Sequence, residues 1–82
     1  MARIEKLFDK IRNNPKNVRF EDACKAAEAI GFVHKSQNGT SHAAFSRPGE
    51  PMALNFQSRD NGKIPPYQAK QLIVMLEKYG DE

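Results

Sequence analysis

The chain has 82 residues, which is enough for one compact domain and too few for two. Its 39% hydrophobic and 28% charged residues are typical of a small globular domain and not of a disordered segment. The length excludes the large cofactor-binding folds. The formal net charge of +3 is compatible with a polyanionic partner without requiring one.

The cellular environment can be inferred from the cysteine count and the apolar runs. A single cysteine, Cys24, cannot form an internal disulfide, so we expect a reducing, cytoplasmic location. The longest apolar run, from Leu72 to Leu76, is far shorter than the roughly 20 residues of a membrane span. The N-terminus also lacks the apolar segment of a secretory signal. We therefore expect one complete, soluble domain over residues 1–82 with no membrane partner.

Apolar residues repeat with helical spacing in three segments. The first predicts a helix over about residues 3–12 that ends before Pro15. The second predicts a helix that ends at Gly31, where we expect a left-handed cap. Its apolar face is mostly alanine, so a sheet carrying large side chains should lie close against it. The third predicts a helix that begins at Pro65-Pro66 and ends near Tyr79.

Between these helices the periodicity changes to two, which predicts three short strands separated by turns. If Asn38-Gly39 form a two-residue hairpin turn, the paired residues are Gln37 with Thr40, Lys35 with His42, and Phe32 with Phe45. If Pro48-Gly49 are the central residues of the next turn, the pairs are Phe45 with Met52, Ala43 with Leu54, and His42 with Asn55.

This register assigns alternate residues of the strands to two faces of one sheet. The buried face is expected to hold Phe32, His34, Ala43, Phe45, Met52, Leu54 and Phe56. The open face is expected to hold Val33, Lys35, His42, Ala44, Ala53, Asn55 and Gln57. The element order α-α-β-β-β-α therefore predicts an α+β domain of two layers, a three-stranded antiparallel meander with helices on one face.

His42 is the candidate catalytic residue because the register places it in the middle strand, on the open face, between Lys35 and Asn55. An exposed imidazole can accept and return a proton near neutral pH. Pairing geometry alone favours an ordinary surface histidine, and His34 on the buried face is expected to be structural. Ser41 points to the face opposite His42, which disfavours a serine hydrolase.

Other chemistry is limited by the residues present. Two histidines and one cysteine do not reproduce a zinc-ligand spacing, so we expect no metal and no cofactor. The positive charge near the open face is enough for a few phosphates and comes from Lys35, Arg47, Arg59, Lys63 and Lys70. Backbone amides around Gly39 are further candidates for phosphate contact. Tyr67 is expected either to stack on a base or to seal the edge of the core.

The string Gly39-Thr40-Ser41-His42, with Gly31-Phe32 before it and Phe45 and Pro48 after it, resembles the HicA toxin family. The resemblance covers about residues 17–79 and includes a similar ending from Gly62 to Leu72. It implies a HicA-like domain on a double-stranded-RNA-binding-like α-β-β-β-α fold, to which the helix at about residues 3–12 is an addition. The chain departs from the pattern at Ala43 and Ala44, where members often carry a second histidine.

The resemblance further implies a cytoplasmic toxin that cleaves mRNA, with His42 as its catalytic histidine and a HicB-like antitoxin as its partner. RNA carries its own nucleophile, the 2′-hydroxyl, so a metal-independent endoribonuclease needs only proton transfer and charge stabilisation. The residues expected to contact RNA are Lys35, Asn38, Gly39, Ser41, Arg47, Asn55, Lys63 and Lys70.

Two other functions remain open from the sequence. The first is a non-catalytic RNA-binding module, because the same fold also reads RNA by its shape. The second is a protein-interaction domain whose amphipathic first helix docks a partner or a second copy of the chain, giving a homo-oligomer.

Overall fold

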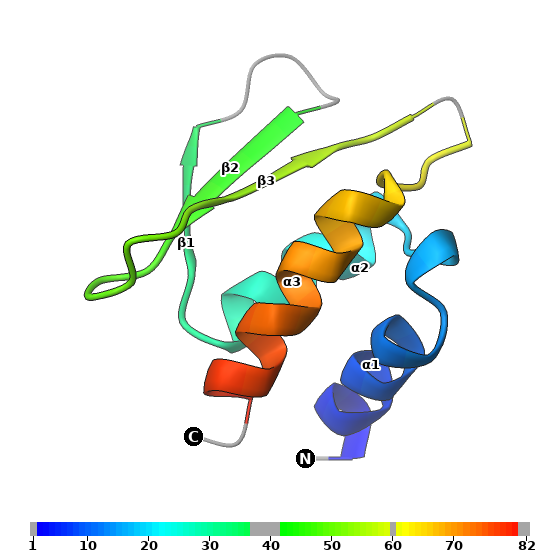
Figure 1. The fold of residues 1–82 in the computed structure, drawn as a ribbon, viewed down its shortest axis with the longest axis horizontal. Helices are drawn as coiled ribbons and strands as arrows, with labels where there is room; N and C mark the ends of the chain where they lie inside the picture. Colours follow the sequence, from blue (N-terminus) through cyan, green and yellow to red (C-terminus); the bar gives the residue numbers. More distant parts are fainter. Residues whose placement is uncertain (1, 37–41, 60, 81–82) are drawn as a thin grey trace.

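The computed structural model describes residues 2–36, 42–59 and 61–80. The elements in chain order are α1 (Ala2–Asn13), the 3-10 helix η1 (Pro15–Asn17), α2 (Phe20–Ala29), β1 (Val33–Ser36), β2 (His42–Ser46), β3 (Leu54–Gln57) and α3 (Pro66–Tyr79). The strands form one antiparallel meander in the order β1-β2-β3. Helices α2 and α3 pack on one face of this sheet, and α1 packs on both helices (Figure 1). The predicted α+β class and element order are confirmed.

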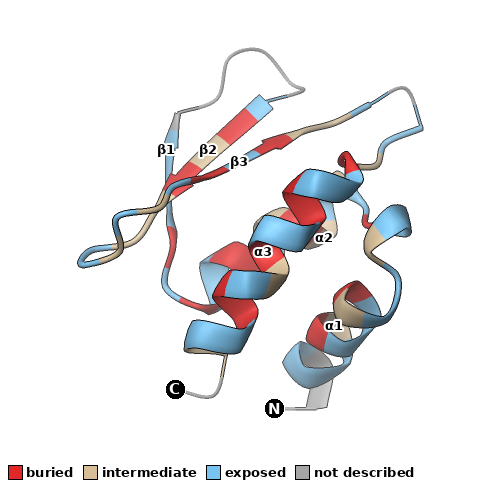
Figure 2. Cartoon of the chain, viewed as in Figure 1, coloured by how far each residue is buried: buried red, intermediate tan, exposed pale blue. Residues whose placement is uncertain are grey.

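The contact between α2 and the sheet follows from small residues on the helix and large ones on the strands. Ala23, Ala26 and Ala27 have no exposed surface, as expected for a helix face pressed against a sheet. The sheet contributes Phe45 and Phe56, whose ring centroids lie 5.7 Å apart within the core. Figure 2 shows the buried positions gathered between the sheet and the helices.

Helix α2 ends as predicted, with Gly31 in the left-handed region at φ +94°. The amide of Gly31 donates to Glu28 O at 3.1 Å, and the amide of Phe32 donates to Ala27 O at 3.0 Å. These two bonds form a Schellman cap, which satisfies carbonyls at the helix end. The cap turns the chain directly into β1.

Helix α1 contributes to the core of the domain. Phe8 and Ile11 are buried and Leu7 is partly buried against the core. Arg12 Nε lies 2.7 Å from Glu77 Oε2, which joins α1 to α3 on the surface. Most of the apolar stripe that suggested a docking helix therefore packs within the chain, with Ile4 left exposed. None of the helices that the structure describes is long and apolar enough to cross a bilayer.

The predicted pairing of β1 with β2 is wrong. Phe45 lies opposite His34 and not opposite Phe32, and a bulge follows His34. A bulge adds one residue to a strand without a partner, which moves the later pairs by one position. Lys35 falls within this irregular step and does not pair with His42. The predicted pair Gln37 and Thr40, and the turn between them, lie outside the described residues.

The predicted pairing of β2 with β3 is wrong as well, because the observed partners lie two residues further along β3. Phe45 pairs with Leu54 and His42 pairs with Gln57, where the expected partners were Met52 and Asn55. The turn at residues 47–50 forms as expected, with the Glu50 amide donating to Arg47 O at 3.0 Å. Strand β3 begins only at Leu54, and two features of the preceding residues account for this. Pro51 has no amide hydrogen to donate to the ladder, and the Glu50 side chain is hydrogen-bonded to α3.

The assignment of residues to faces survives the register errors, because a shift of two residues keeps each side chain on its own side of the sheet. Phe32, Ala43, Phe45, Leu54 and Phe56 are buried as predicted, and Met52 is partly buried. The prediction that His34 is buried is wrong. The residue shares the face of Phe45 and stacks on that ring at a centroid distance of 5.0 Å, but it is exposed.

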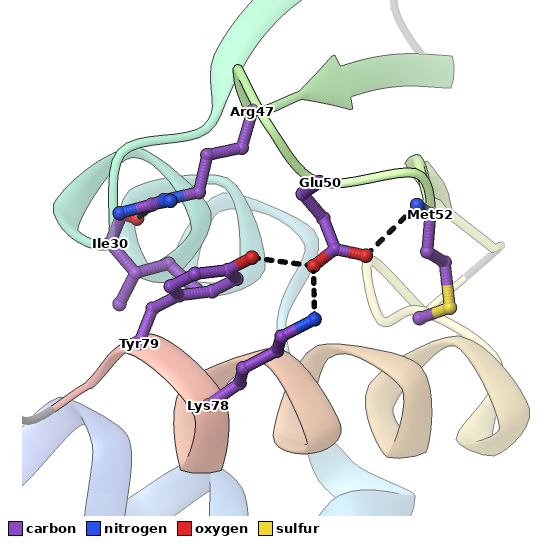
Figure 3. Close-up of polar contacts among 6 residues, drawn as sticks. All are labelled: Ile30, Arg47, Glu50, Met52, Lys78 and Tyr79. Carbon is purple, nitrogen blue, oxygen red and sulfur yellow. Dashed lines mark hydrogen bonds and ion pairs between the residues drawn. The ribbon is translucent and has the colours of Figure 1, made fainter.

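Glu50 joins the connection between β2 and β3 to the end of α3 (Figure 3). Its side chain is only 4% exposed. Oε1 accepts hydrogen bonds from Lys78 Nζ at 2.7 Å and from the Tyr79 hydroxyl at 2.5 Å, and Oε2 accepts the Met52 amide at 2.9 Å. The bonds from Lys78, Tyr79 and Met52 lower the pKa of Glu50 to about 2.

Arg47 completes this cluster on the other side of the tyrosine ring. Its Nε donates to Ile30 O at 2.8 Å, at the capped end of α2. Its guanidinium lies 3.7 Å from the centroid of the Tyr79 ring, a cation–π distance. The end of α2, the β2–β3 connection and the end of α3 are therefore held together by polar contacts.

Replacing Glu50 should change the acid stability of the fold. The carboxyl has a lower pKa in the folded chain than its ordinary value of 4.5, so its contribution is present above pH 4.5 and is lost as the pH falls toward 2. We expect Glu50→Gln to be less stable than the wild type at pH 7, with the difference shrinking on acidification. Urea unfolding between pH 7 and pH 2 measures this. Glu5→Gln, at an exposed position of α1, is the control. A difference that stays constant with pH would contradict the assignment.

Candidate functional site

His42 begins β2 and pairs with Gln57, the last residue of β3. It is exposed, and it alternates with the buried Ala43, so it belongs to the face of the sheet opposite α2 and α3. Asn55 is exposed on the same face, diagonally across from His42. The predicted place of His42 in the middle strand and on the open face is confirmed.

A depression of about 340 Å³ lies beside His42. It is lined by residues of β2, β3 and the start of α3, namely His42, Ala43, Ala44, Asn55, Phe56, Gln57 and Gln68. Its side-chain polar groups are one imidazole and three carboxamides. The N–H groups of these side chains can donate to the oxygens of a bound phosphodiester.

Gln68 positions this end of the sheet, and sequence reasoning missed it. The residue is buried, and its Oε1 accepts a hydrogen bond from the backbone amide of Gln57 at 2.8 Å. Its Nε2 donates to the Tyr67 hydroxyl at 3.4 Å. The spacing of Gln68 from the apolar residues of α3 could have identified it. Gln68 precedes Leu72 by four residues, so it is a polar residue on the apolar face of α3.

Two further depressions lie beside the first. The second is lined by Gln57, Ser58, Arg59 and Asn61. The third is lined by Lys16, Arg59, Asn61, Lys63, Ile64, Pro65 and Pro66. Since the first and second share Gln57, and the second and third share Arg59 and Asn61, the three depressions lie next to one another. We call this row of three neighbouring depressions the polar groove; its lining begins with His42 and ends with Lys16.

Backbone hydrogen bonds fix the loop that forms the middle of the polar groove. The Phe20 amide donates to Gly62 O at 3.0 Å, and the Ile64 amide donates to Val18 O at 2.9 Å. Within the loop, the Arg59 amide donates to Lys63 O at 2.9 Å. The segment before α3 is thereby attached to the start of α2, and the cationic residues on it have a defined backbone position.

The predicted RNA contacts do not all gather at His42. Lys63 lies in the polar groove, and Lys70 is exposed on α3. Lys35 is exposed on β1, in the strand on the other side of β2 from β3. Arg47 follows the far end of β2 and contacts Ile30 and Tyr79. The remaining predicted contacts lie outside the described residues: Asn38, Gly39 and Ser41.

Among the residues that the structure describes, the titrating groups with shifted pKa values lie away from the polar groove. Besides Glu50 and its partner Lys78, whose pKa is raised by the bond to Glu50, there is Cys24. Burial, with a smaller contribution from Glu28, raises the pKa of the Cys24 thiol to about 11. Across residues 2–36, 42–59 and 61–80, no three His, Cys, Asp or Glu side chains gather where they could hold a metal ion.

Removing the acceptor on Gln68 should destabilise the end of the sheet. Gln68→Met keeps the length of the side chain but leaves the Gln57 amide without its partner, so we expect a loss of about 1–2 kcal/mol in the free energy of unfolding. Gln68→Glu keeps an acceptor oxygen and should lose less. Urea denaturation of the three proteins at neutral pH measures both values. Equal stability of Gln68→Met and wild type would show that the bond contributes nothing.

Comparisons of this chain with models of protein families, with curated proteins and with solved structures find no match. The functional argument therefore depends on the polar groove, on His42 at its end, and on the short motif around that histidine.

Proposed function

We propose that this chain is a metal-independent endoribonuclease that cleaves mRNA in the cytoplasm, as the toxin of a toxin-antitoxin pair with a HicB-like antitoxin. One observation carries most of the proposal: His42 is exposed on the sheet face that none of the described helices covers, and it lines a depression together with the carboxamide residues Asn55, Gln57 and Gln68. An RNA strand can approach such a site without any rearrangement of the fold. The sequence motif that ends in His42 gives the same assignment.

The proposed reaction uses the nucleophile that RNA provides. His42 accepts the proton of a 2′-hydroxyl, and that oxygen attacks the adjacent phosphorus. The bond from phosphorus to the 5′-oxygen breaks, leaving a 2′,3′-cyclic phosphate and a 5′-oxygen that takes a proton from water to become a hydroxyl. The carboxamides of Asn55 and Gln57 line the same depression and can donate hydrogen bonds to the phosphoryl oxygens. A single general acid or base contributes about 10²–10⁴-fold, so turnover should be slow.

We assign the positive charge for this reaction to only part of the set of cations expected from the sequence. Lys35 does not pair with His42, and Arg47 is engaged at the other end of the sheet. Arg59 and Lys63 come next along the polar groove after Gln57, the residue opposite His42. We assign to them the binding of phosphates next to the one that is cleaved.

A second candidate function is a non-catalytic RNA-binding module. The observation that favours it is the composition of the first depression, whose described lining contains His42 but no lysine or arginine. Ala43 and Ala44 occupy the positions of a second histidine in the family pattern. Such a module would bind RNA with a strong salt dependence and leave it intact.

Cleavage of a labelled single-stranded RNA by the wild type and by His42→Ala tests the proposal. We expect the variant to lose at least about 100-fold in rate while keeping its thermal stability, because the exposed imidazole contributes to chemistry and not to the core. His34→Ala is the matched control and should cleave normally. RNA with a 2′-deoxy sugar at the scissile position should resist all three proteins.

Each other outcome of this assay has a defined meaning. Wild-type cleavage by His42→Ala would reject His42 as the catalytic group. Binding of RNA by the wild type without cleavage, in the presence or absence of EDTA, would favour the binding module. Growth arrest on induction of the wild type, relieved by His42→Ala or by a co-expressed HicB-like protein, would support the toxin assignment.

A further inference from the structure

We infer that the polar groove binds a single RNA strand, with one base stacked on Tyr67 and the neighbouring phosphates beside Lys16, Arg59 and Lys63. The inference deepens the proposed function and rests on it for the identity of the strand as RNA. It adds a stacking residue and a set of phosphate contacts to the site at His42.

Tyr67 has the properties of a stacking platform. It is 58% exposed although it is a large aromatic residue, and it lies in the first turn of α3. Its neighbours on both sides line the groove: Pro65 and Pro66 line the third depression, and Gln68 lines the first. Gln68 donates to the Tyr67 hydroxyl and is itself held by the Gln57 amide. The ring is therefore tethered beside the groove, with its surface available to a base.

The cations come from two separate segments that the fold brings together. Lys16 belongs to η1, whereas Arg59 and Lys63 belong to the loop before α3. The bridge between Arg19 and Lys63 attaches this loop to the start of α2, close in sequence to η1. None of the three cations forms an ion pair with a carboxylate in the described part of the chain. Their charges are available to an external anion.

The arrangement favours a single strand over a duplex. A base can lie on an aromatic ring only when it has left its own stack, which single strands permit at low cost. Arg59 follows Gln57 by two residues, which span at most about 7 Å, so the first cation of the groove lies near the residue that pairs with His42. One strand can therefore pass His42 and the cationic residues in sequence.

The test separates binding from cleavage by using an RNA that cannot react. The probe is a single-stranded oligonucleotide with 2′-O-methyl sugars throughout, which lacks the nucleophile, and with one 2-aminopurine as a fluorescent base. The variants are Tyr67→Ala, with Tyr67→Phe as its control, and Lys16→Gln/Arg59→Gln. The control for the double variant is Lys6→Gln/Lys25→Gln, which removes the same charge from exposed positions on α1 and α2. Thermal unfolding verifies that all variants fold.

We expect Tyr67→Ala to weaken binding about tenfold and to abolish the quenching of 2-aminopurine, whereas Tyr67→Phe keeps both. Lys16→Gln/Arg59→Gln should lower the salt slope of binding by about 1.4, since each single-strand phosphate contact contributes about 0.7. The Lys6→Gln/Lys25→Gln control should leave the slope unchanged. A duplex of the same sequence should bind more weakly.

The inference is overturned if Tyr67→Ala and the double variant each bind within twofold of the wild type, or if the duplex binds as tightly as the single strand. The proposed catalysis can fail independently. If His42→Ala still cleaves RNA while the groove variants lose binding, the catalytic assignment is wrong and the strand path stands. If His42→Ala loses cleavage while the groove variants bind normally, the catalysis stands and the path is wrong.

Discussion

The close approach of α2 to the sheet is the constraint on which the rest of the structure depends. Three fully buried alanines allow the helix to lie close to the sheet, in the same core cluster as Phe45 and Phe56. Together α2 and α3 cover one face of the sheet, and α1 packs on the helices on the side away from it (Figure 1). None of the described helices covers the second face of the sheet, so side chains on that face, His42 included, point outward.

The register errors show which part of a sheet can be predicted from a sequence. Alternation of apolar and polar residues is a property of each strand alone, so the buried residues were assigned correctly except for His34 and the partial burial of Met52. Pairing depends in addition on how the strands are joined. The bulge after His34 and the attraction of Glu50 to the end of α3 involve contacts that short-range turn rules do not contain.

The same distinction applies to the site. The exposure of His42 followed from its position in an alternating strand, and Gly31 followed from the end of a helical pattern. The presence of Lys16 and Arg59 in one depression could not be predicted from the sequence. The two residues are far apart in the chain and are brought together by the packing of η1 and the loop before α3. Arg47 was expected among the cations near the open face, but its guanidinium lies over the Tyr79 ring, which comes from the last turn of α3 and which short-range patterns do not place there.

The hydrogen bond from the Gln57 amide to Gln68 also affects what the edge of the sheet can do. Strand β3 is an edge strand, and an amide that points away from its neighbour is a template for another chain to add itself as an extra strand. Gln68 occupies that amide with a side chain from the domain's own helix. The addition of a strand from a second copy is thereby disfavoured at the end of the sheet where His42 lies. This end of β3 then stays accessible to a ligand that binds without adding a strand.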